Sequence, residues 1–317
     1  MRKIVIYHNY PESLLDKLRQ KYKNEFEFLV CRNRKEMEQE IENAEIYMGF
    51  KCDKDIINKG KNLKWVQLLR AGADAVPLEE LKDRGIILTS GRGIHKIHMA
   101  EYAIASMIML ARSWHLMFRN QMEGKWDRSP FQYEINGETL GIIGIGSIGS
   151  EIAKRAKTVG MKGIGIRKKQ EKVEYVDCLY TPCEMEEVFR QSDYIINLLP
   201  ATEETKELID AHYFDLLKEN ACFINIGRGS TVNEEDLIKA LDAGKLRGAV
   251  LDVFKDEPLP KDSSLWSLPN VVLTPHICGE SHGKYEEKAL EVIEQNIEAY
   301  MQDKSKMKNK IDLDKGY

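Results

Sequence analysis

The chain has 317 residues, of which 43% are hydrophobic and 31% are charged, and its formal net charge is -4. This composition excludes an intrinsically disordered chain, which combines few apolar residues with a high net charge. The near balance of 47 Lys and Arg against 51 Asp and Glu, without a basic block, argues against nucleic acid as the main partner. The length predicts about two domains.

The N-terminus has the pattern of a strand. Residues 1–7 lack the apolar stretch and the small-residue cleavage site of a signal peptide. The longest apolar run, 103–111, is far shorter than the roughly 18–20 residues that span a bilayer. We therefore expect a soluble, cytoplasmic protein with no membrane partner. The six cysteines show no C-x-x-C pair and no metal-ligand spacing, so we expect buried, reduced thiols and no metal.

The first third of the chain alternates short β-rich runs with helical patterns. A helix is predicted at 13–22, and strands are predicted at 4–7, 26–30, 46–50, 65–69 and 86–89. Strands that are separated by helices pair in parallel, because each crossover covers a face of the sheet. This part of the chain therefore predicts a doubly wound α/β unit.

A long apolar helix is predicted next, from about Ile97 to Met122. Its apolar residues occupy more than one face, so the helix needs two burial partners. One partner is its own domain. The other is expected to be a second subunit, which predicts a homodimer through the 97–122 region.

A second α/β unit begins at Glu138. Helices fall at 184–190 and 234–243, among others, and strands are predicted at 139–143, 163–166, 194–198, 222–226, 246–252 and 271–274. The last helix, about 281–301, follows the completed second unit and is expected to pack on the first. We therefore predict a discontinuous domain of 1–96 with 281–317 and a domain of 97–280, hinged around a cleft. The Lys-rich segment from Gln302 is expected to be a frayed, solvated tail.

An apolar strand runs directly into a G-x-G-x-x-G motif at Gly144, Gly146 and Gly149. The three glycines permit a tight turn, a close approach of backbone N–H groups to a pyrophosphate, and close packing of the next helix on the strand. That helix is predicted from about Ile148 to Val159, and the N–H groups near its start, at Ser147 and Ile148, are free to bind the anion. The motif alone also fits a Gly-rich turn, but the strand before it and the helix after it favour dinucleotide binding.

The strand after this helix ends at Arg167, which is 167 − 149 = 18 residues past the third glycine. A site that prefers NAD has an acid here, which accepts hydrogen bonds from the ribose hydroxyls. This chain has Arg167, Lys168 and Lys169 instead. A guanidinium can pair bidentately with a 2′-phosphate, and lysines add positive potential. We therefore predict NADP(H) as the favoured cofactor and NAD(H) as a possible one; the alternative is an ordinary solvated basic turn.

Three later segments place chemically active side chains at or beyond predicted strand ends. Arg228 follows Asn225-Ile226-Gly227, Asp252 and Glu257 belong to one segment, and His276 ends Leu273-Thr274-Pro275-His276. In an open α/β sheet the carboxyl ends of the strands border the ligand crevice. Each residue alone is ordinarily structural, but together with a dinucleotide motif they indicate a catalytic set.

On these motifs the chain resembles the D-isomer-specific 2-hydroxyacid dehydrogenase family, which includes glyoxylate/hydroxypyruvate reductases, phosphoglycerate dehydrogenases and D-lactate dehydrogenases. The matching stretches are Ala71-Gly72-Ala73-Asp74, the glycine motif, Ser192-Asp193 through Leu199-Pro200 with Thr202 and Thr205, Gly227-Arg228-Gly229, Asp252-Val253-Phe254 with Glu257-Pro258-Leu259, and Pro275-His276. The resemblance covers nearly the whole chain in the family's order. It implies a flavodoxin-like substrate domain and a Rossmann dinucleotide-binding domain.

The resemblance also implies hydride transfer between NADP(H) and a small 2-oxo or 2-hydroxy acid of the D-series, with a glyoxylate or hydroxypyruvate type of substrate favoured. His276 would be the general acid and base, and Glu257 would hydrogen-bond its other ring nitrogen and favour the charged form. Arg228 would hold the substrate through its carboxylate and carbonyl oxygens. Backbone N–H groups near Ala71 and Gly72 would clamp the same carboxylate.

For the cofactor, the resemblance implies that Asp252 accepts a hydrogen bond from the nicotinamide carboxamide, and that Pro200 and Thr205 line the site. The segment 277–280 departs from the usual small continuation after the histidine, and His95 and His98 are expected to make structural hydrogen bonds. Two other functions remain open. One is a formate or phosphite dehydrogenase on the same scaffold, and the other is a nucleotide-sensing module without catalysis. The complete catalytic set favours chemistry, although fold and motif alone do not establish function.

Overall fold

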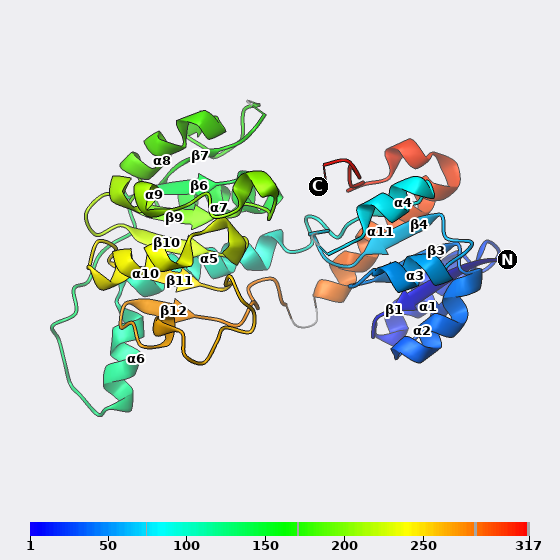
Figure 1. The fold of residues 1–317 in the computed structure, drawn as a ribbon, viewed down its shortest axis with the longest axis horizontal. Helices are drawn as coiled ribbons and strands as arrows, with labels where there is room; N and C mark the ends of the chain where they lie inside the picture. The colour runs from blue at the N-terminus through cyan, green and yellow to red at the C-terminus, as the bar shows by residue number, and fades with distance from the viewer. Residues whose placement is uncertain (74, 170, 282–283, 316–317) are drawn as a thin grey trace. The chain divides into compact units, whose positions relative to one another are not determined.

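The computed structural model describes residues 1–317 except 74, 170, 282–283 and 316–317. The chain forms two compact units, which are shown in Figure 1. Unit 1 comprises Met1–Ile94 and the C-terminal residues from Ser281, and unit 2 comprises His95–Glu280. Each unit contains one parallel sheet with helices on both faces, which confirms the predicted doubly wound α/β fold class.

The sheet of unit 1 has the strand order β2-β1-β3-β4-β5. Its strands are β1 (Arg2–Tyr7), β2 (Phe26–Val30), β3 (Ile46–Gly49), β4 (Trp65–Leu68) and β5 (Ile87–Thr89). Its helices are α1 (Glu12–Lys21), α2 (Arg34–Glu40), α3 (Lys54–Lys59), α4 (Leu78–Asp83) and α11 (Tyr285–Gln302). The side chains of successive strand residues point to opposite faces. Ile4 and Ile6 therefore pack with α1 and α11, whereas Val5 packs with α2, α3 and α4.

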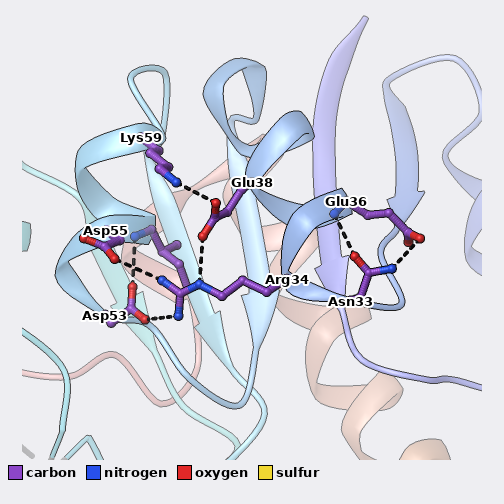
Figure 2. A network of polar contacts seen from close by, with 8 residues as sticks. Asn33, Arg34, Glu36, Glu38, Asp53, Asp55 and Lys59 are labelled. Atoms are coloured by element: carbon purple, nitrogen blue, oxygen red, sulfur yellow. Dashed lines mark hydrogen bonds and ion pairs between the residues drawn. The ribbon is translucent and has the colours of Figure 1, made fainter.

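A network of charges joins α2 to α3 on the surface of unit 1 (Figure 2). The Arg34 guanidinium donates to Glu38 at 2.7 Å, to Asp53 at 2.8 Å and to Asp55 at 3.1 Å. Asp53 is also the N-cap of α3, where its side chain accepts from the N–H of Ile56. The network therefore connects a residue at the start of α2 with the cap of the neighbouring helix. Its charges are exposed, so buried apolar contacts, and not these pairs, hold the helices on the sheet.

The prediction of a frayed C-terminal tail is wrong. Met307 and Ile311 are buried, with 5% and 6% of their surface exposed. The N–H of Ile311 donates to Leu88 at 2.9 Å, and Lys310 forms an antiparallel bridge with Thr89. The segment therefore lies along β5 and closes the edge of the sheet. The alternating Lys and Asp residues suggested solvation, but the two apolar residues between them supply the contacts that order the chain.

The sheet of unit 2 has the strand order β12-β11-β10-β9-β6-β7-β8. Its strands are β6 (Thr139–Ile143), β7 (Lys162–Ile166), β8 (Cys178–Tyr180), β9 (Tyr194–Asn197), β10 (Cys222–Asn225), β11 (Gly248–Leu251) and β12 (Val271–Leu273). Its helices are α5 (Lys96–Ala111), α6 (Trp114–Met122), α7 (Ser147–Thr158), α8 (Met185–Gln191), α9 (Ala211–Leu216) and α10 (Glu234–Asp242). From β6 the chain adds β7 and β8 toward one edge of the sheet and then adds β9 to β12 toward the other edge. The boundary between β6 and β9 is therefore the topological switch point, where ligands bind in such sheets.

Helices cover both faces of the unit 2 sheet. Residues of α8, α9 and α10 pack on one face, and residues of α5 and α7 pack on the other. The single helix predicted over 97–122 is wrong, because the chain breaks into α5 and α6 at Ser113. That residue has a left-handed backbone, with φ 49°, and its hydroxyl donates to the carbonyl oxygen of Phe131. None of the α6 residues is buried, and Figure 1 shows α6 and the segment after it projecting from the body of unit 2.

Candidate functional site

The glycine motif forms the turn between β6 and α7. Gly144 has a φ of 102°, a conformation that residues with a Cβ rarely adopt, so glycine is required there. A Cβ at Gly149 would lie 3.1 Å from the carbonyl oxygen of Gly144, so the helix packs tightly on the turn. A Cβ at Gly146 would meet nothing within 4 Å, which leaves open space in front of the helix.

The start of α7 fits an anionic group. Its N-cap is Gly146, which has no side chain to cap the helix. The N–H groups of Ser147, Ile148 and Gly149 have no intrahelical acceptor, because the first turn of a helix precedes its hydrogen-bonding carbonyls. Such N–H groups, together with the helix dipole, bind phosphate oxygens well. The predicted dinucleotide-binding turn is thus present in a geometry that suits a pyrophosphate.

The basic residues predicted to read the ribose lie at the adjacent strand end. Arg167 directly follows β7, which pairs with β6, and its N–H donates to the carbonyl oxygen of Tyr180. Its guanidinium lies 3.7 Å from Glu171, and the Lys168 ammonium lies 2.9 Å from Glu204. The Lys168–Glu204 pair is largely exposed, whereas the Arg167 side chain keeps only 32% of its surface exposed. The positive charge is therefore placed next to the glycine turn.

Three neighbouring strands place the predicted catalytic residues at one edge of the sheet. Arg228 follows β10, Asp252 and Glu257 follow β11, and His276 follows β12. The strands are parallel, so their carboxyl ends lie on the same side, together with the ends of β6 and β7. The structure therefore brings the residues of the predicted catalytic set and the glycine turn to a single edge of unit 2.

His276 and Glu257 form a direct pair. The Nδ1 atom of His276 lies 2.7 Å from Oε2 of Glu257, and the side chains keep 50% and 37% of their surface exposed. The other oxygen of Glu257, Oε1, accepts from the N–H of Phe254 at 3.1 Å. The pair can orient an imidazole and hold a proton at an exposed site, which is what general acid–base chemistry requires.

Arg228 lies on a turn that is fitted closely to its surroundings. A Cβ at Gly229 would lie 2.0 Å from the carbonyl carbon and oxygen of Phe254, so only glycine allows this approach. The Nη1 atom of Arg228 donates to the carbonyl oxygen of Gly227 at 2.8 Å. Burial and the Asp252 carboxylate raise the pKa of the Cys278 thiol, and the Arg228 guanidinium acts in the opposite direction. The Arg228 guanidinium therefore acts electrostatically on Cys278, which belongs to the segment that follows His276.

The interpretation of the sequence missed a buried polar network under the Arg228 turn. The Nδ2 atom of Asn197 donates to Oδ1 of Asn225 at 3.0 Å and to the hydroxyl of Thr231 at 2.7 Å. The Thr231 hydroxyl donates to the carbonyl oxygen of Arg228 at 2.7 Å. The available signal was an asparagine at the end of each of two apolar strands, β9 and β10.

The loop after β9 carries Pro200 and Thr205. The Thr205 hydroxyl donates to the carbonyl oxygen of Pro200 at 2.6 Å and accepts from the N–H of Thr202 at 2.9 Å. Thr205 therefore shapes the loop that presents Pro200, which is exposed. The loop follows β9, which is the strand next to β6, so both residues lie at the switch point of the sheet.

Ala71 and Gly72 belong to unit 1. They follow β4 on a bend and are partly exposed. The fourth residue of their motif, Asp74, lies outside the described residues. β4 pairs with β3, which pairs with β1, so Phe50 and His8 follow the adjacent strand ends. In unit 1, too, the predicted substrate contacts lie at the carboxyl edge of the sheet.

The remaining sequence expectations have mixed outcomes. The carbonyl oxygen of Gly279 lies 2.8 Å from Nδ1 of His95 and 2.8 Å from Nε2 of His98, as expected for structural hydrogen bonds. Of the cysteines, Cys178 and Cys183 are exposed, contrary to the expectation that all are buried. Among the described residues, no group of His, Cys, Asp and Glu has the arrangement of a metal site. None of the helices in the described part of the chain is both long and apolar enough to cross a bilayer.

The chain is similar to several known proteins. Residues 104–278 match the model of the D-isomer specific 2-hydroxyacid dehydrogenase, NAD binding domain. A probable 2-ketogluconate reductase of Dictyostelium discoideum is 36% identical, over 86% of this chain and 85% of that protein. A glyoxylate reductase of Pyrococcus horikoshii is 33% identical, over 94% of this chain and 92% of that protein. The structure of a D-isomer specific 2-hydroxyacid dehydrogenase from Xanthobacter autotrophicus, in complex with NADPH and MES, is 26% identical, with a TM-score of 0.86 over 100% of this chain and 99% of that one.

Proposed function

Because the chain belongs to the D-isomer specific 2-hydroxyacid dehydrogenase family, we propose that it reduces the carbonyl group of a small 2-oxo acid to the D-2-hydroxy acid and catalyses the reverse reaction. The observation that carries this proposal is the pairing of His276 with Glu257 at 2.7 Å, at the sheet edge that also holds the glycine turn. The reduction adds a hydride to the carbonyl carbon and a proton to its oxygen. The pair supplies a group that can give and take the proton.

NADP(H) is the favoured cofactor in this proposal, and NAD(H) is possible. Gly144, Gly146 and Gly149, with the N–H groups of Ser147 and Ile148, bind the pyrophosphate in the open space before α7. Arg167 and Lys168 bind the phosphate on the ribose, at the end of the adjacent strand. The complex of the Xanthobacter relative with NADPH supports the same preference.

The reduced cofactor supplies the hydride when it is bound. Nε2 of His276 donates the proton to the substrate oxygen, while Glu257 holds the ring through Nδ1. Arg228 binds the carboxylate and the carbonyl oxygen of the oxo acid and stabilises the negative charge that develops on that oxygen. Unit 1 is proposed as the substrate domain, in which the backbone N–H groups of Ala71 and Gly72 are candidates for binding a carboxylate.

Three further residues are assigned to the cofactor in the same proposal. Asp252 accepts a hydrogen bond from the nicotinamide carboxamide, and Pro200 lines the cofactor site on the loop that Thr205 shapes. Unit 2 is thus proposed as the dinucleotide-binding domain. The glycine turn of unit 2 lies at the carboxyl edge of a parallel sheet, where ligands bind in folds of this kind, and this position supports the assignment.

The favoured substrates are of the glyoxylate and hydroxypyruvate type, because relatives at 33% identity or more include a glyoxylate reductase and a hydroxypyruvate reductase. The test is the loss of NADPH or NADH absorbance with glyoxylate, hydroxypyruvate, pyruvate and phenylpyruvate. We expect turnover with at least one of these acids, at a higher kcat/KM with NADPH than with NADH. Tight cofactor binding without turnover of any 2-oxo acid would favour a nucleotide-sensing module instead.

We also infer that the protein is a homodimer formed through α6 and the segment after it. Trp114, Phe118 and Met122 lie on one face of α6 and expose 47%, 53% and 88% of their surface. Trp126 and Phe131, further along, expose 95% and 77%. Apolar surface of this extent is uncommon on a monomer and is typical of a subunit interface.

A further inference from the structure

The carboxylate of Asp252 holds the segment that carries His276. Asp252 is fully buried, with 0% of its surface exposed. Its Oδ1 accepts from the hydroxyl of Thr274 at 2.5 Å and from the N–H of Ile277 at 2.9 Å, and its Oδ2 accepts from the N–H of Cys278 at 3.0 Å. One buried side chain thus receives hydrogen bonds from residues on both sides of His276.

These bonds stabilise an unfavourable backbone conformation. His276 has a φ of 54°, in the left-handed region that residues other than glycine adopt uncommonly. Its own N–H donates to the carbonyl oxygen of Asp252 at 2.8 Å. Such conformations persist where the surrounding contacts over-determine them. The contacts to Asp252 therefore fix the direction in which the imidazole leaves the backbone.

The chain of hydrogen bonds continues to α5. The hydroxyl of Tyr102 lies 2.6 Å from the hydroxyl of Thr274. Thr274 has a single hydroxyl proton, which it donates to Asp252, so it can only accept from Tyr102. Burial raises the pKa of Tyr102 to about 12, so its hydroxyl keeps the proton that it donates. The chain therefore runs in one direction, from Tyr102 through Thr274 to Asp252.

From this geometry we infer that Tyr102 and Thr274 are positioning residues for His276, and that they act through Asp252. Neither residue is part of the catalytic set that the motifs indicated. Tyr102 fixes the rotamer of the Thr274 hydroxyl, and the oriented hydroxyl fixes the Asp252 carboxylate that holds the turn at 276–278. The inference rests on the proposed function, in which His276 is the group that transfers the proton.

The test combines steady-state kinetics with amide hydrogen exchange of the free protein. The variants are Tyr102→Phe, Thr274→Val, the double variant, and Thr274→Ser. Tyr194→Phe is the matched control, because Tyr194 is a buried tyrosine of unit 2 whose hydroxyl accepts from Arg247 at 2.6 Å, near the amino ends of the strands.

We expect Tyr102→Phe to lower kcat about three- to tenfold, which corresponds to the loss of one hydrogen bond. The double variant should lose no more than Thr274→Val alone, because both changes break one chain. Thr274→Ser should keep the activity. In the free protein, exchange of the Ile277 and Cys278 amides should accelerate in Tyr102→Phe and not in Tyr194→Phe.

Additive losses in the double variant, or unchanged exchange at Ile277 and Cys278 in Tyr102→Phe, would overturn the inference. The exchange result does not depend on turnover. A wild-type protein that reduces no 2-oxo acid would refute the proposed function, whereas the exchange data would still decide whether Tyr102 holds the turn.

Discussion

Nδ1 of His276 lies 2.7 Å from Oε2 of Glu257, although the two residues belong to loops that follow different strands. The second oxygen of Glu257 accepts from the N–H of Phe254 in its own loop. The N–H of Phe254 therefore helps to hold the Glu257 carboxylate in the orientation in which it pairs with the imidazole. A histidine that donates through Nδ1 has Nε2 as the nitrogen that can exchange a proton with a substrate. The pair therefore defines which atom of His276 does the chemistry.

Arg228→Lys should lower kcat/KM for the oxo acid roughly ten- to hundredfold, because an ammonium cannot reproduce the two parallel hydrogen bonds of a guanidinium. Steady-state kinetics with the best substrate measure this effect. Arg247→Lys is a suitable control, since Arg247 contacts Tyr194 and the ring of Tyr133 and should affect stability more than KM. Equal kinetics for Arg228→Lys and the wild type would exclude Arg228 as the substrate clamp.

Arg167→Asp should raise KM for NADPH roughly ten- to hundredfold and improve the use of NADH, because the variant loses a charged hydrogen-bond partner of the 2′-phosphate and gains an acceptor for ribose hydroxyls. The ratio of kcat/KM for the two cofactors reports the change. Arg190→Asp changes the net charge equally, at a helix residue paired with Glu186. If both variants change the ratio alike, Arg167 acts only through the general charge of the unit.

Replacement of Trp114 and Phe118 by Glu should convert the dimer to a monomer, because the change places two carboxylates in an apolar interface. Light scattering coupled to size exclusion should give twice the mass of one chain for the wild type and the mass of one chain for the double variant. Trp266→Glu is the control, at a tryptophan that is 55% exposed elsewhere on unit 2. A monomeric wild type would contradict the dimer.

Burial lowers the pKa of His8 from its ordinary value of 6.5, although Glu286 acts in the opposite direction. The unfolded chain then takes up a proton at a higher pH than the folded one, so the free energy of unfolding should fall as the pH decreases from 6.5 toward the folded pKa. His8→Phe keeps a ring beside Tyr10 and Phe50.

Urea unfolding at several pH values measures this prediction. His8→Phe should show a weaker loss of stability between neutral and acidic pH than the wild type. Tyr10→Phe removes only a hydroxyl and should retain the wild-type dependence. Identical pH dependence in His8→Phe and the wild type would show that His8 does not contribute to the acid sensitivity.

Much of the fold could be predicted because buried strands leave runs of apolar residues between helical patterns. β6 has the predicted bounds, whereas several strands end one residue earlier than predicted. The reason is visible at Leu69 and Ile226, which are apolar and buried but lie beyond their strands. The edge strand β8 was missed, because it has only three residues, of which Cys178 is exposed and Leu179 and Tyr180 are partly buried.

The site was predictable where its residues lie in short motifs and not where it depends on contacts between distant segments. The glycine turn needs only local sequence, whereas His276 was predicted from the combination of its segment with those of Arg228 and Asp252. The hydrogen bonds of Asp252 to Thr274 and Cys278 join segments that are 22 and 26 residues apart. Tyr102, on a helix 172 residues from Thr274, gives no signal in the sequence beyond its helical position.

In the proposed mechanism His276 transfers the proton, and the glycine turn with Arg167 binds the cofactor. The direct test is His276→Ala, assayed for turnover of the best 2-oxo acid and for NADPH affinity by fluorescence titration. We predict a loss of kcat of about 10²–10⁴-fold with nearly unchanged NADPH affinity. Turnover of the variant at the wild-type rate would exclude His276 as the group that transfers the proton.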